Sequence, residues 1–204
     1  MIIIIDCGIG NLRSIHKALQ KLGFPAEVSK DKKAISKASG LVLPGVGAFD
    51  AAMKDLRNTS IETAIDQAVA MKKPMLGICL GLQQLFLSSE EGKEKGLDLL
   101  AGTSKRFKSA SPFNLKVPHM GWNRLKIKRP CPILEGIESG SMVYFVHSYY
   151  VVPEDETTVS AETDYGIDFA SVVHKDNIYG VQFHPEKSGD TGLKILKNFG
   201  RLCK

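Results

Sequence analysis

Hydrophobic positions in the first part of the chain follow two periods, one typical of buried strands and one typical of amphipathic helices. Residues 2–6 begin with a continuous β-branched run, which is typical of a strand covered on both faces. Residues 12–22 then carry apolar side chains at helical spacing. The same patterns predict further strands at 26–28, 40–43 and 75–78, and helices at 49–56 and 61–71. Strands separated by helices in this way predict βαβ units and a parallel sheet.

The pattern changes in the second half of the chain. Residues 99–181 read as short strands and turns with little helical period, for example at 142–146, 149–152 and 169–174. Residues 189–202 return to a helical period and predict a closing helix. We find no linker between the halves. The predicted fold is therefore one α/β domain over residues 1–204, with a mostly parallel central sheet flanked by helices and a mixed or antiparallel extension in the second half.

Composition and charge exclude several classes of protein. With 204 residues, 43% hydrophobic and 24% charged, the chain is an ordinary globular one. The net charge of +5 is mild, and its densest basic stretch, 125–129, alternates like a strand with a solvated face and has no aromatic platform for nucleic acid. A basic docking surface for an acidic partner is the less favoured alternative. No apolar run approaches the length of a membrane span, and residues 1–6 are too short for a signal peptide.

Cysteines, histidines and glycines show no cofactor or metal pattern. Four cysteines are scattered without a CxxC pair, so neither a zinc site nor a disulfide framework is suggested, and we expect a reduced, cytoplasmic setting. These are Cys7, Cys79, Cys131 and Cys203. Five histidines, at 16, 119, 147, 174 and 184, show no ligand spacing. Gly8 and Gly10 suggest a dinucleotide loop, but Arg13 stands at the third glycine position, so we discard that interpretation.

The stretch 75–83, MLGICLGLQ, carries the first candidate chemistry. A short buried strand runs into Gly77-Ile78-Cys79-Leu80-Gly81, and a helix is predicted from Leu80. Glycines two positions before and two after a nucleophile, between strand and helix, are the pattern of a nucleophile elbow, here with cysteine in place of serine. Both glycines are needed because a Cβ at either would clash with neighbouring backbone in so tight a turn.

An elbow of this kind predicts a reactive thiol. It seats the Cys79 sulfur at a helix N-terminus, where the positive end of the dipole favours thiolate, and it aims the N–H of Leu80 at a developing oxyanion. The alternative is a buried strand in which Cys79 is only a small apolar filler.

The stretch 178–186, IYGVQFHPE, offers the partners that a thiol nucleophile needs. Pro185 keeps His184 out of the helical region, so we expect an extended tripeptide in which His184 and Glu186 project on the same side. A thiol needs a base, and the imidazole needs an acceptor that sets its tautomer. The alternative is a surface histidine beside a solvated glutamate. Taken together, the two stretches predict a Cys79–His184–Glu186 triad.

These motifs resemble those of a known family. PGVGAF at 44–49, GICLGLQ at 77–83 and GVQFHPEKS at 180–188 are similar to the class I (triad) glutamine amidotransferases, and the order of motifs and the length match over nearly the whole chain. KVPHMGWN at 116–123 and YFVHSY at 144–149 further resemble the glutaminase subunits of imidazole glycerol phosphate synthases, which act in histidine biosynthesis. The chain departs from the family pattern at Cys7, where tyrosine is more common, and at Leu82, where methionine is usual.

The resemblance implies an activity and a set of site residues. The family hydrolyses L-glutamine to glutamate and ammonia, with Cys79 as nucleophile, His184 as base and Glu186 orienting the ring. Leu80 and the Val46–Gly47 segment would supply oxyanion donors. By the same resemblance, glutamine would be held by Gly45, Gln83, Ser148 and Tyr149. No cofactor or metal is implied.

The resemblance also implies a partner. Ammonia would pass to the cyclase subunit of imidazole glycerol phosphate synthase, a (β/α)-barrel, in a heterodimer. By resemblance, that subunit would be faced by Asn11, Pro118, Met120, Trp122, Asn123, Tyr144 and Lys187. From the residues alone, Trp122 and His119 are more often core residues than ligands. Neither nucleic acid nor a membrane is expected as a partner.

Three alternatives remain open. The first is the glutaminase of another synthase, such as anthranilate or GMP synthase, against which the segment 118–123 argues. The second is a cysteine peptidase or related hydrolase on a similar sheet. The third is a catalytically silent binding module that kept the fold, which the intact Cys79, His184 and Glu186 weaken.

Overall fold

A parallel sheet forms the centre of the molecule. The computed structural model describes residues 1–6, 8, 11–108 and 116–204, so part of the turn predicted at 7–11, Cys7 included, lies outside the described residues. The parallel strands are β1 (Ile2–Ile5), β2 (Ala26–Ser29), β3 (Gly40–Gly45), β4 (Met75–Cys79) and β13 (Ile178–Val181). They lie in the order β2-β1-β3-β4-β13, and each neighbouring pair is parallel. The parallel sheet predicted from the sequence is confirmed.

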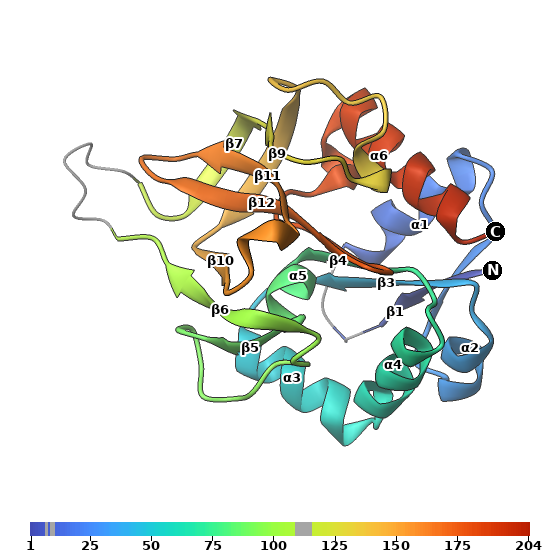
Figure 1. Cartoon of the computed structure of the whole chain (residues 1–204). Coiled ribbons are helices and arrows are strands. Elements are labelled where there is room, and N and C mark those ends of the chain that lie inside the picture. Colours follow the sequence, from blue (N-terminus) through green and yellow to red (C-terminus); the bar gives the residue numbers. More distant parts are fainter. Residues whose placement is uncertain (7, 9–10, 109–115) are drawn as a thin grey trace.

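Helices cover both faces of these strands (Figure 1). One face packs against α1 (Leu12–Lys21) and α6 (Gly189–Leu202), and the other against α2 (Lys32–Lys37), α3 (Phe49–Asn58) and α4 (Ile61–Ala70). Along β1 the side chains alternate between the two hydrophobic clusters, with Ile2 and Ile4 in one and Ile3 and Ile5 in the other. This alternation explains why β1 is a continuous apolar run rather than an amphipathic one.

The sheet continues beyond β13 as a largely antiparallel extension. The order runs on as β13-β12-β10-β6-β5, in which β12 is antiparallel to β13 and β10 is antiparallel to both β12 and β6. Among the described strands of this extension, only β5 and β6 are parallel neighbours. The bounds are β5 (Phe86–Ser89), β6 (Leu100–Arg106), β8 (Lys126–Ile127), β10 (Tyr149–Pro153), β11 (Val159–Asp164) and β12 (Asp168–Lys175). β11 pairs with β12 and β8 at the side of this path. The predicted extension is therefore confirmed.

A separate two-stranded ribbon of β7 (His119–Arg124) and β9 (Met142–His147) lies beside the extension. The ribbon is antiparallel, and Trp122 stands opposite Tyr144. Alternate residues face the core, so His119, Phe145 and His147 are buried while Met120 and Trp122 are exposed.

Short helices complete the chain, and two local predictions differ from the structure. The elements are α5 (Leu80–Gln84), η1 (Pro132–Leu134), η2 (Glu156–Thr158) and η3 (Pro185–Lys187). α2 was not predicted, because only Ile35 of its six residues is buried and no apolar period results. β5 begins at Phe86, in the stretch that follows the helix predicted from Leu80, and was not predicted either.

The basic stretch 125–129 is a solvated face with matched charges. Lys126 pairs with Asp164 and Asp168, and Lys128 pairs with Glu162. Among the described helices, none is both long enough and apolar enough to cross a lipid bilayer.

Candidate active site

Cys79 lies at a strained turn between β4 and α5. β4 ends at Cys79 and α5 begins at Leu80, and Cys79 has φ of 55° and ψ of −109°. A positive φ at a residue with a side chain costs about 1–3 kcal/mol and is found where the surrounding structure enforces it. A Cβ on Gly81 would lie 1.8 Å from the Leu43 oxygen, and one on Gly77 would lie 2.7 Å from the Gly81 oxygen. The predicted need for glycine at both positions is confirmed.

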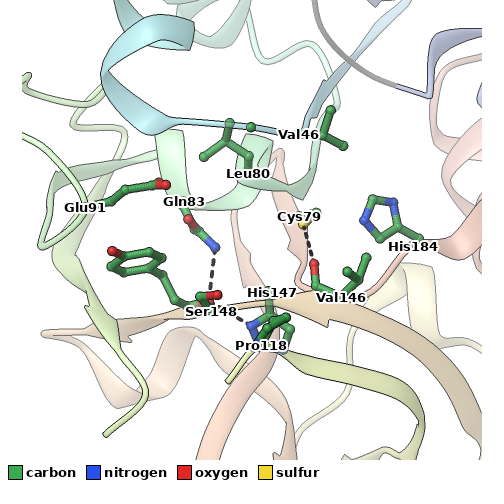
Figure 2. Close-up of a pocket in the computed structure, with 12 residues that line it drawn as sticks. Val46, Cys79, Leu80, Gln83, Glu91, Pro118, Val146, His147, Ser148 and His184 are labelled. Carbon is green, nitrogen blue, oxygen red and sulfur yellow. Dashed lines mark hydrogen bonds between the residues drawn. The ribbon is translucent and has the colours of Figure 1, made fainter. Parts of the chain in front are cut away.

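A cavity of about 340 Å³ opens at the Cys79 sulfur (Figure 2). Its volume falls in the range of small-molecule sites. It is lined by Val46, Gly47, Cys79, Leu80, Gln83, Glu91, Pro118, Val146, His147, Ser148, Tyr149 and His184. The carboxyl ends of β3 and β4, the start of β10 and the segment after β13 thus meet at one edge of the sheet.

Gly45 is absent from the cavity lining. It pairs in register with Cys79, and a Cβ there would lie 2.8 Å from the Leu80 Cβ. Its position therefore allows β3 to lie close against the elbow. All the other residues predicted to bind glutamine or an oxyanion border the cavity.

His184 and Glu186 form a buried pair behind the cavity. His184 Nδ1 lies 2.9 Å from Glu186 Oε1, and the two side chains are 3% and 0% exposed. Because a carboxylate only accepts, Nδ1 carries a hydrogen, and Nε2 is the nitrogen left for proton transfer. Nε2 has no hydrogen-bond partner among the described residues, and His184 borders the same cavity as Cys79.

The backbone of this pair differs from the prediction. We expected an extended tripeptide, but Pro185–Lys187 is a 3₁₀ turn, η3, in which the Lys187 N–H bonds to the His184 oxygen at 3.0 Å. The prediction was wrong because the fixed φ of proline also suits the first position of a helical turn. The side chains of His184 and Glu186 meet across the turn.

Electrostatics favour a charged His184 and an ionised Glu186. Burial alone lowers the pKa of His184, but its interactions with Cys79 and Glu186 outweigh burial and raise the pKa to about 9. Burial alone raises the pKa of Glu186, but the bonds from His184 and from Asn11 outweigh it and lower the pKa. The Asn11 amide donates to Glu186 Oε1 at 3.1 Å. Asn11, predicted at a partner interface, thus contacts the triad itself.

The Cys79 sulfur has two weak hydrogen-bonding neighbours. It donates to the Val146 oxygen at 3.8 Å and accepts from the Gln182 amide at 3.8 Å. The side chain is buried, yet it borders the cavity rather than being enclosed in hydrocarbon. This placement argues against the interpretation of Cys79 as an apolar filler.

Glu91 lies on the opposite side of Cys79 from His184 in Figure 2. Its Oε2 accepts the N–H of Phe49 at the start of α3, at 3.1 Å. Burial first, and the nearby Asp50 charge, raise the pKa of Glu91, while the Phe49 bond lowers it. Asp50 holds this loop by accepting the N–H groups of Lys93 and Glu94. The sequence did not point to Glu91, because it stands in a polar run that reads as a surface loop. Val146 and His147 were also missed as cavity residues.

The predicted interface residues divide between the ribbon and the cavity. Met120 and Trp122 are 62% and 53% exposed, and the Trp122 ring meets the Tyr144 ring edge-on at 6.0 Å. Lys187 Nζ lies 6.0 Å from the centre of the Tyr144 ring. We call Met120, Trp122, Tyr144 and Lys187 the ribbon patch. From the residues alone, Trp122 and His119 were both expected in the core. Trp122 is instead exposed, whereas His119 is buried.

The ribbon patch is bonded directly to the triad segment. The backbone carbonyl oxygen of Tyr144 accepts the backbone N–H of His184 at 2.9 Å. Pro118 borders the cavity. Asn123 is half-buried, and its side-chain amide nitrogen bonds to His119 Nε2 and to the backbone oxygen of Asp164. Among the described residues, no group of His, Cys, Asp or Glu side chains is arranged to hold a metal ion.

Comparison with known proteins agrees with this geometry. The family model of class-I glutamine amidotransferases matches residues 3–202. The imidazole glycerol phosphate synthase subunit HisH of Moorella thermoacetica is 51% identical over 204 residues, covering 100% of this chain and 95% of that protein. The same subunit of Methanosarcina barkeri is 54% identical over 205 residues, covering 99% and 98%. A solved glutamine amidotransferase shares the fold, with a TM-score of 0.78 at 21% identity over 99% of this chain and 98% of that one. The chain therefore belongs to the class I glutamine amidotransferase family and, within it, to the HisH subunits of imidazole glycerol phosphate synthase.

Proposed function

We propose that Cys79, His184 and Glu186 form the catalytic triad with which this chain hydrolyses L-glutamine to glutamate and ammonia. One observation carries the proposal. Cys79, in a strained conformation, and His184, whose Nε2 has no hydrogen-bond partner among the described residues, border the same cavity. The buried carboxylate of Glu186 bonds to the other nitrogen of that histidine. These are the nucleophile, base and orienting group of an acyl-transfer site.

The cavity suggests how glutamine lies. Its side-chain amide would point to Cys79 and His184, and its α-ammonium group would meet the carboxylate of Glu91 at the other end (Figure 2). A charge-assisted bond of this kind contributes about 1.5–3 kcal/mol. Ser148 lies between the two ends in Figure 2. Ser148 and Tyr149 both line the cavity and would contact the glutamine backbone.

The reaction then follows in two halves. His184 Nε2 holds the proton of the Cys79 thiol, in the imidazolium–thiolate pair that the raised pKa of His184 favours. The thiolate attacks the amide carbon, and the oxyanion receives N–H groups from Leu80 and the Val46–Gly47 segment. One such donor contributes about 3 kcal/mol. The C–N bond breaks as His184 returns the proton to the nitrogen, which leaves as ammonia from a thioester. His184 next takes a proton from water, and the oxygen of that water attacks the thioester. The C–S bond then breaks, which releases glutamate and restores the Cys79 thiolate beside the protonated His184.

We further propose that the chain works in a heterodimer with the cyclase subunit of imidazole glycerol phosphate synthase. The ribbon patch supports this, because it is exposed, aromatic and bonded to the backbone of His184. Exposed aromatic side chains of this kind are typical of interface centres. A nucleophilic thiol has to stay reduced, as cysteines do in the cytoplasm, and we propose that compartment.

A glutaminase assay with matched cysteine variants tests the triad. Glutamate formation from glutamine is measured for wild type, Cys79→Ala and Cys131→Ala, with and without the cyclase subunit and its nucleotide ligand. We expect Cys79→Ala to lose activity by at least about 1,000-fold, since Cys79 is the only thiol among the described residues that line the cavity. Cys131, a buried free thiol outside the cavity lining, provides the control and should leave turnover near wild type.

The same assay separates the alternatives. Glutaminase activity that survives in Cys79→Ala would rule out the proposed mechanism. Release of peptides without turnover of free glutamine would favour a peptidase. Stimulation by the synthase subunit for anthranilate or GMP, and not by the cyclase, would assign the chain to another synthase.

A further inference from the structure

One backbone carbonyl in the cavity wall receives two hydrogen bonds. The Tyr149 oxygen lies 2.8 Å from His147 Nδ1 and 3.1 Å from Gln83 Nε2. A carbonyl can only accept, so both nitrogens carry a hydrogen that points at it. This single acceptor therefore sets the tautomer of His147 and the orientation of the Gln83 amide. Figure 2 shows the Gln83 side chain pointing from α5 toward the segment that carries His147 and Ser148.

The first arm of bonds runs from His147 to the ribbon. With its hydrogen on Nδ1, His147 must accept at Nε2, which lies 3.0 Å from His119 Nδ1. His119 therefore also carries its hydrogen on Nδ1 and accepts at Nε2, 3.2 Å from the Asn123 amide nitrogen. The second hydrogen of that amide bonds to the Asp164 oxygen at 2.9 Å. Every donor along the arm thus meets an acceptor, and the direction is unique.

The second arm runs from Gln83 to the candidate nucleophile. The Gln83 amide nitrogen also donates to Gln182 Oε1 at 3.3 Å. The amide nitrogen of Gln182 consequently faces the Cys79 sulfur, at 3.8 Å. Gln182 is fully buried, so this donor has no competition from solvent. An N–H aimed at sulfur favours the charge that develops there when the thiol loses its proton.

The surroundings keep both imidazoles neutral. His119 is stacked between Phe145, at 4.7 Å, and Tyr165, at 4.0 Å. Burial lowers the pKa of His119 to about 4 and, together with smaller contributions, that of His147 to about 3. A second hydrogen on either ring would place two donors face to face, so the network and the neutral state require each other.

We propose that these residues form one directional hydrogen-bond network from Asn123 on the ribbon to the Cys79 sulfur, in which His119, His147 and Gln182 are positioning residues for glutamine hydrolysis. The proposal rests on the proposed function of Cys79. The first arm, through His119 and His147, holds the Tyr149 carbonyl. It thereby holds the part of the cavity wall at Ser148 and Tyr149, against which glutamine would lie. The second arm, through Gln83 and Gln182, holds the Gln182 amide nitrogen against the Cys79 sulfur.

Nitrogen NMR on the imidazoles of the full chain tests the network without using activity. At neutral pH we expect His119 and His147 both as the Nδ1–H tautomer, whereas free histidine prefers the Nε2–H tautomer. Spectra of His119→Asn assign the His119 signals. An Nε2–H or a doubly protonated ring at either position would overturn the network, whatever the outcome of the Cys79→Ala assay.

Two variants of His119 test its positioning role in glutamine kinetics. His119→Phe keeps an aromatic ring in the stack but removes both nitrogens. His119→Asn loses the stack but retains an N–H near the Nδ1 position. A positioning role predicts that His119→Phe raises the KM for glutamine about five- to tenfold with a smaller change in kcat, and that His119→Asn restores most of the loss. A packing role alone predicts the opposite order, and that order would overturn the proposal.

Gln182 is tested by the reactivity of the thiol. We expect Gln182→Leu to lower kcat about tenfold at neutral pH. The rate at which iodoacetamide alkylates Cys79 should fall by about the same factor. Gln182→Glu should be slower still, because it brings a negative charge to the sulfur. Alkylation at the wild-type rate in both folded variants would remove Gln182 from the network.

Discussion

The parallel part of the sheet and the antiparallel strands beside it hold the site in different ways. We call the strands of the extension and of the ribbon together the antiparallel part. In the parallel part, Cys79 is placed by backbone packing, since Gly81 lies so close to Leu43 that no side chain fits between them. In the antiparallel part, the wall at Tyr149 is placed by side-chain hydrogen bonds from His147 and Gln83. Backbone packing tolerates no added atom, whereas a hydrogen-bond network tolerates substitution but depends on protonation. The two parts should therefore fail under different perturbations.

The largest expected effect is an added methyl group in the parallel part. Gly81→Ala would bring a Cβ to 1.8 Å from the backbone oxygen of Leu43, and both residues are buried. We expect it to lower the free energy of unfolding by more than about 4 kcal/mol or to prevent folding. Urea unfolding followed by circular dichroism measures the change.

Gly121→Ala provides the matched change on the ribbon. Gly121 has φ of 130°, and a Cβ there would meet no atom within 4 Å. Only backbone strain remains, so we expect a loss of about 1–3 kcal/mol. Equal losses in the two alanine variants would show that the elbow has room to relax and would contradict the contrast between the two parts.

This contrast also explains how much the sequence could predict. The elbow was predictable because its chemistry depends on residues that are consecutive in the chain, Gly77 to Gly81, and because buried parallel strands have a distinctive apolar pattern. Glu186 was predictable as the partner of His184 for the same reason, even though the extended backbone we expected is a 3₁₀ turn. Local spacing was enough because the two side chains are only two residues apart.

The antiparallel part was less predictable because its key contacts join distant residues. His119 and His147 are 28 residues apart, and Gln83 is 66 residues from Tyr149. No periodic pattern reports such bonds, so no role was predicted for His147. Glu91 was missed because only the packing of its loop against α3 brings the carboxylate to the cavity.

An intermediate effect is expected from acid, and it should arise in the antiparallel part. The pKa of His119 is lowered from 6.5 to about 4 by burial, so below about pH 6.5 the unfolded chain binds a proton that the folded chain does not. The free energy of unfolding therefore decreases as the pH is lowered below about 6.5. At about pH 5 this one imidazole accounts for a loss of about 2 kcal/mol. Urea unfolding at about pH 6.5 and pH 5 measures the loss.

His119→Phe isolates this contribution. The variant should lose about 2 kcal/mol less than wild type on acidification, because its ring cannot be protonated. His184 does not disturb the comparison. Its pKa is raised to about 9, so its stabilising contribution is complete below about pH 6.5 and is lost only as the pH rises toward 9. The same acid sensitivity in both proteins would mean that His119 is not held neutral in the fold.

The smallest effect on the isolated chain is expected at the ribbon patch. Trp122 is 53% exposed, and its ring contact is the edge of Tyr144, so Trp122→Ala should change the free energy of unfolding by less than about 1 kcal/mol. Binding of the cyclase subunit should nevertheless weaken by at least about tenfold, since an exposed tryptophan at an interface centre is a frequent hot spot. Met71→Ala is the control, because Met71 is 57% exposed at the end of α4, on the other face of the sheet from α1 and α6. Titration of each variant with the cyclase subunit decides the question. If Trp122→Ala bound like Met71→Ala, the ribbon patch would not be the docking surface, and the exposure of its aromatic side chains would need another cause.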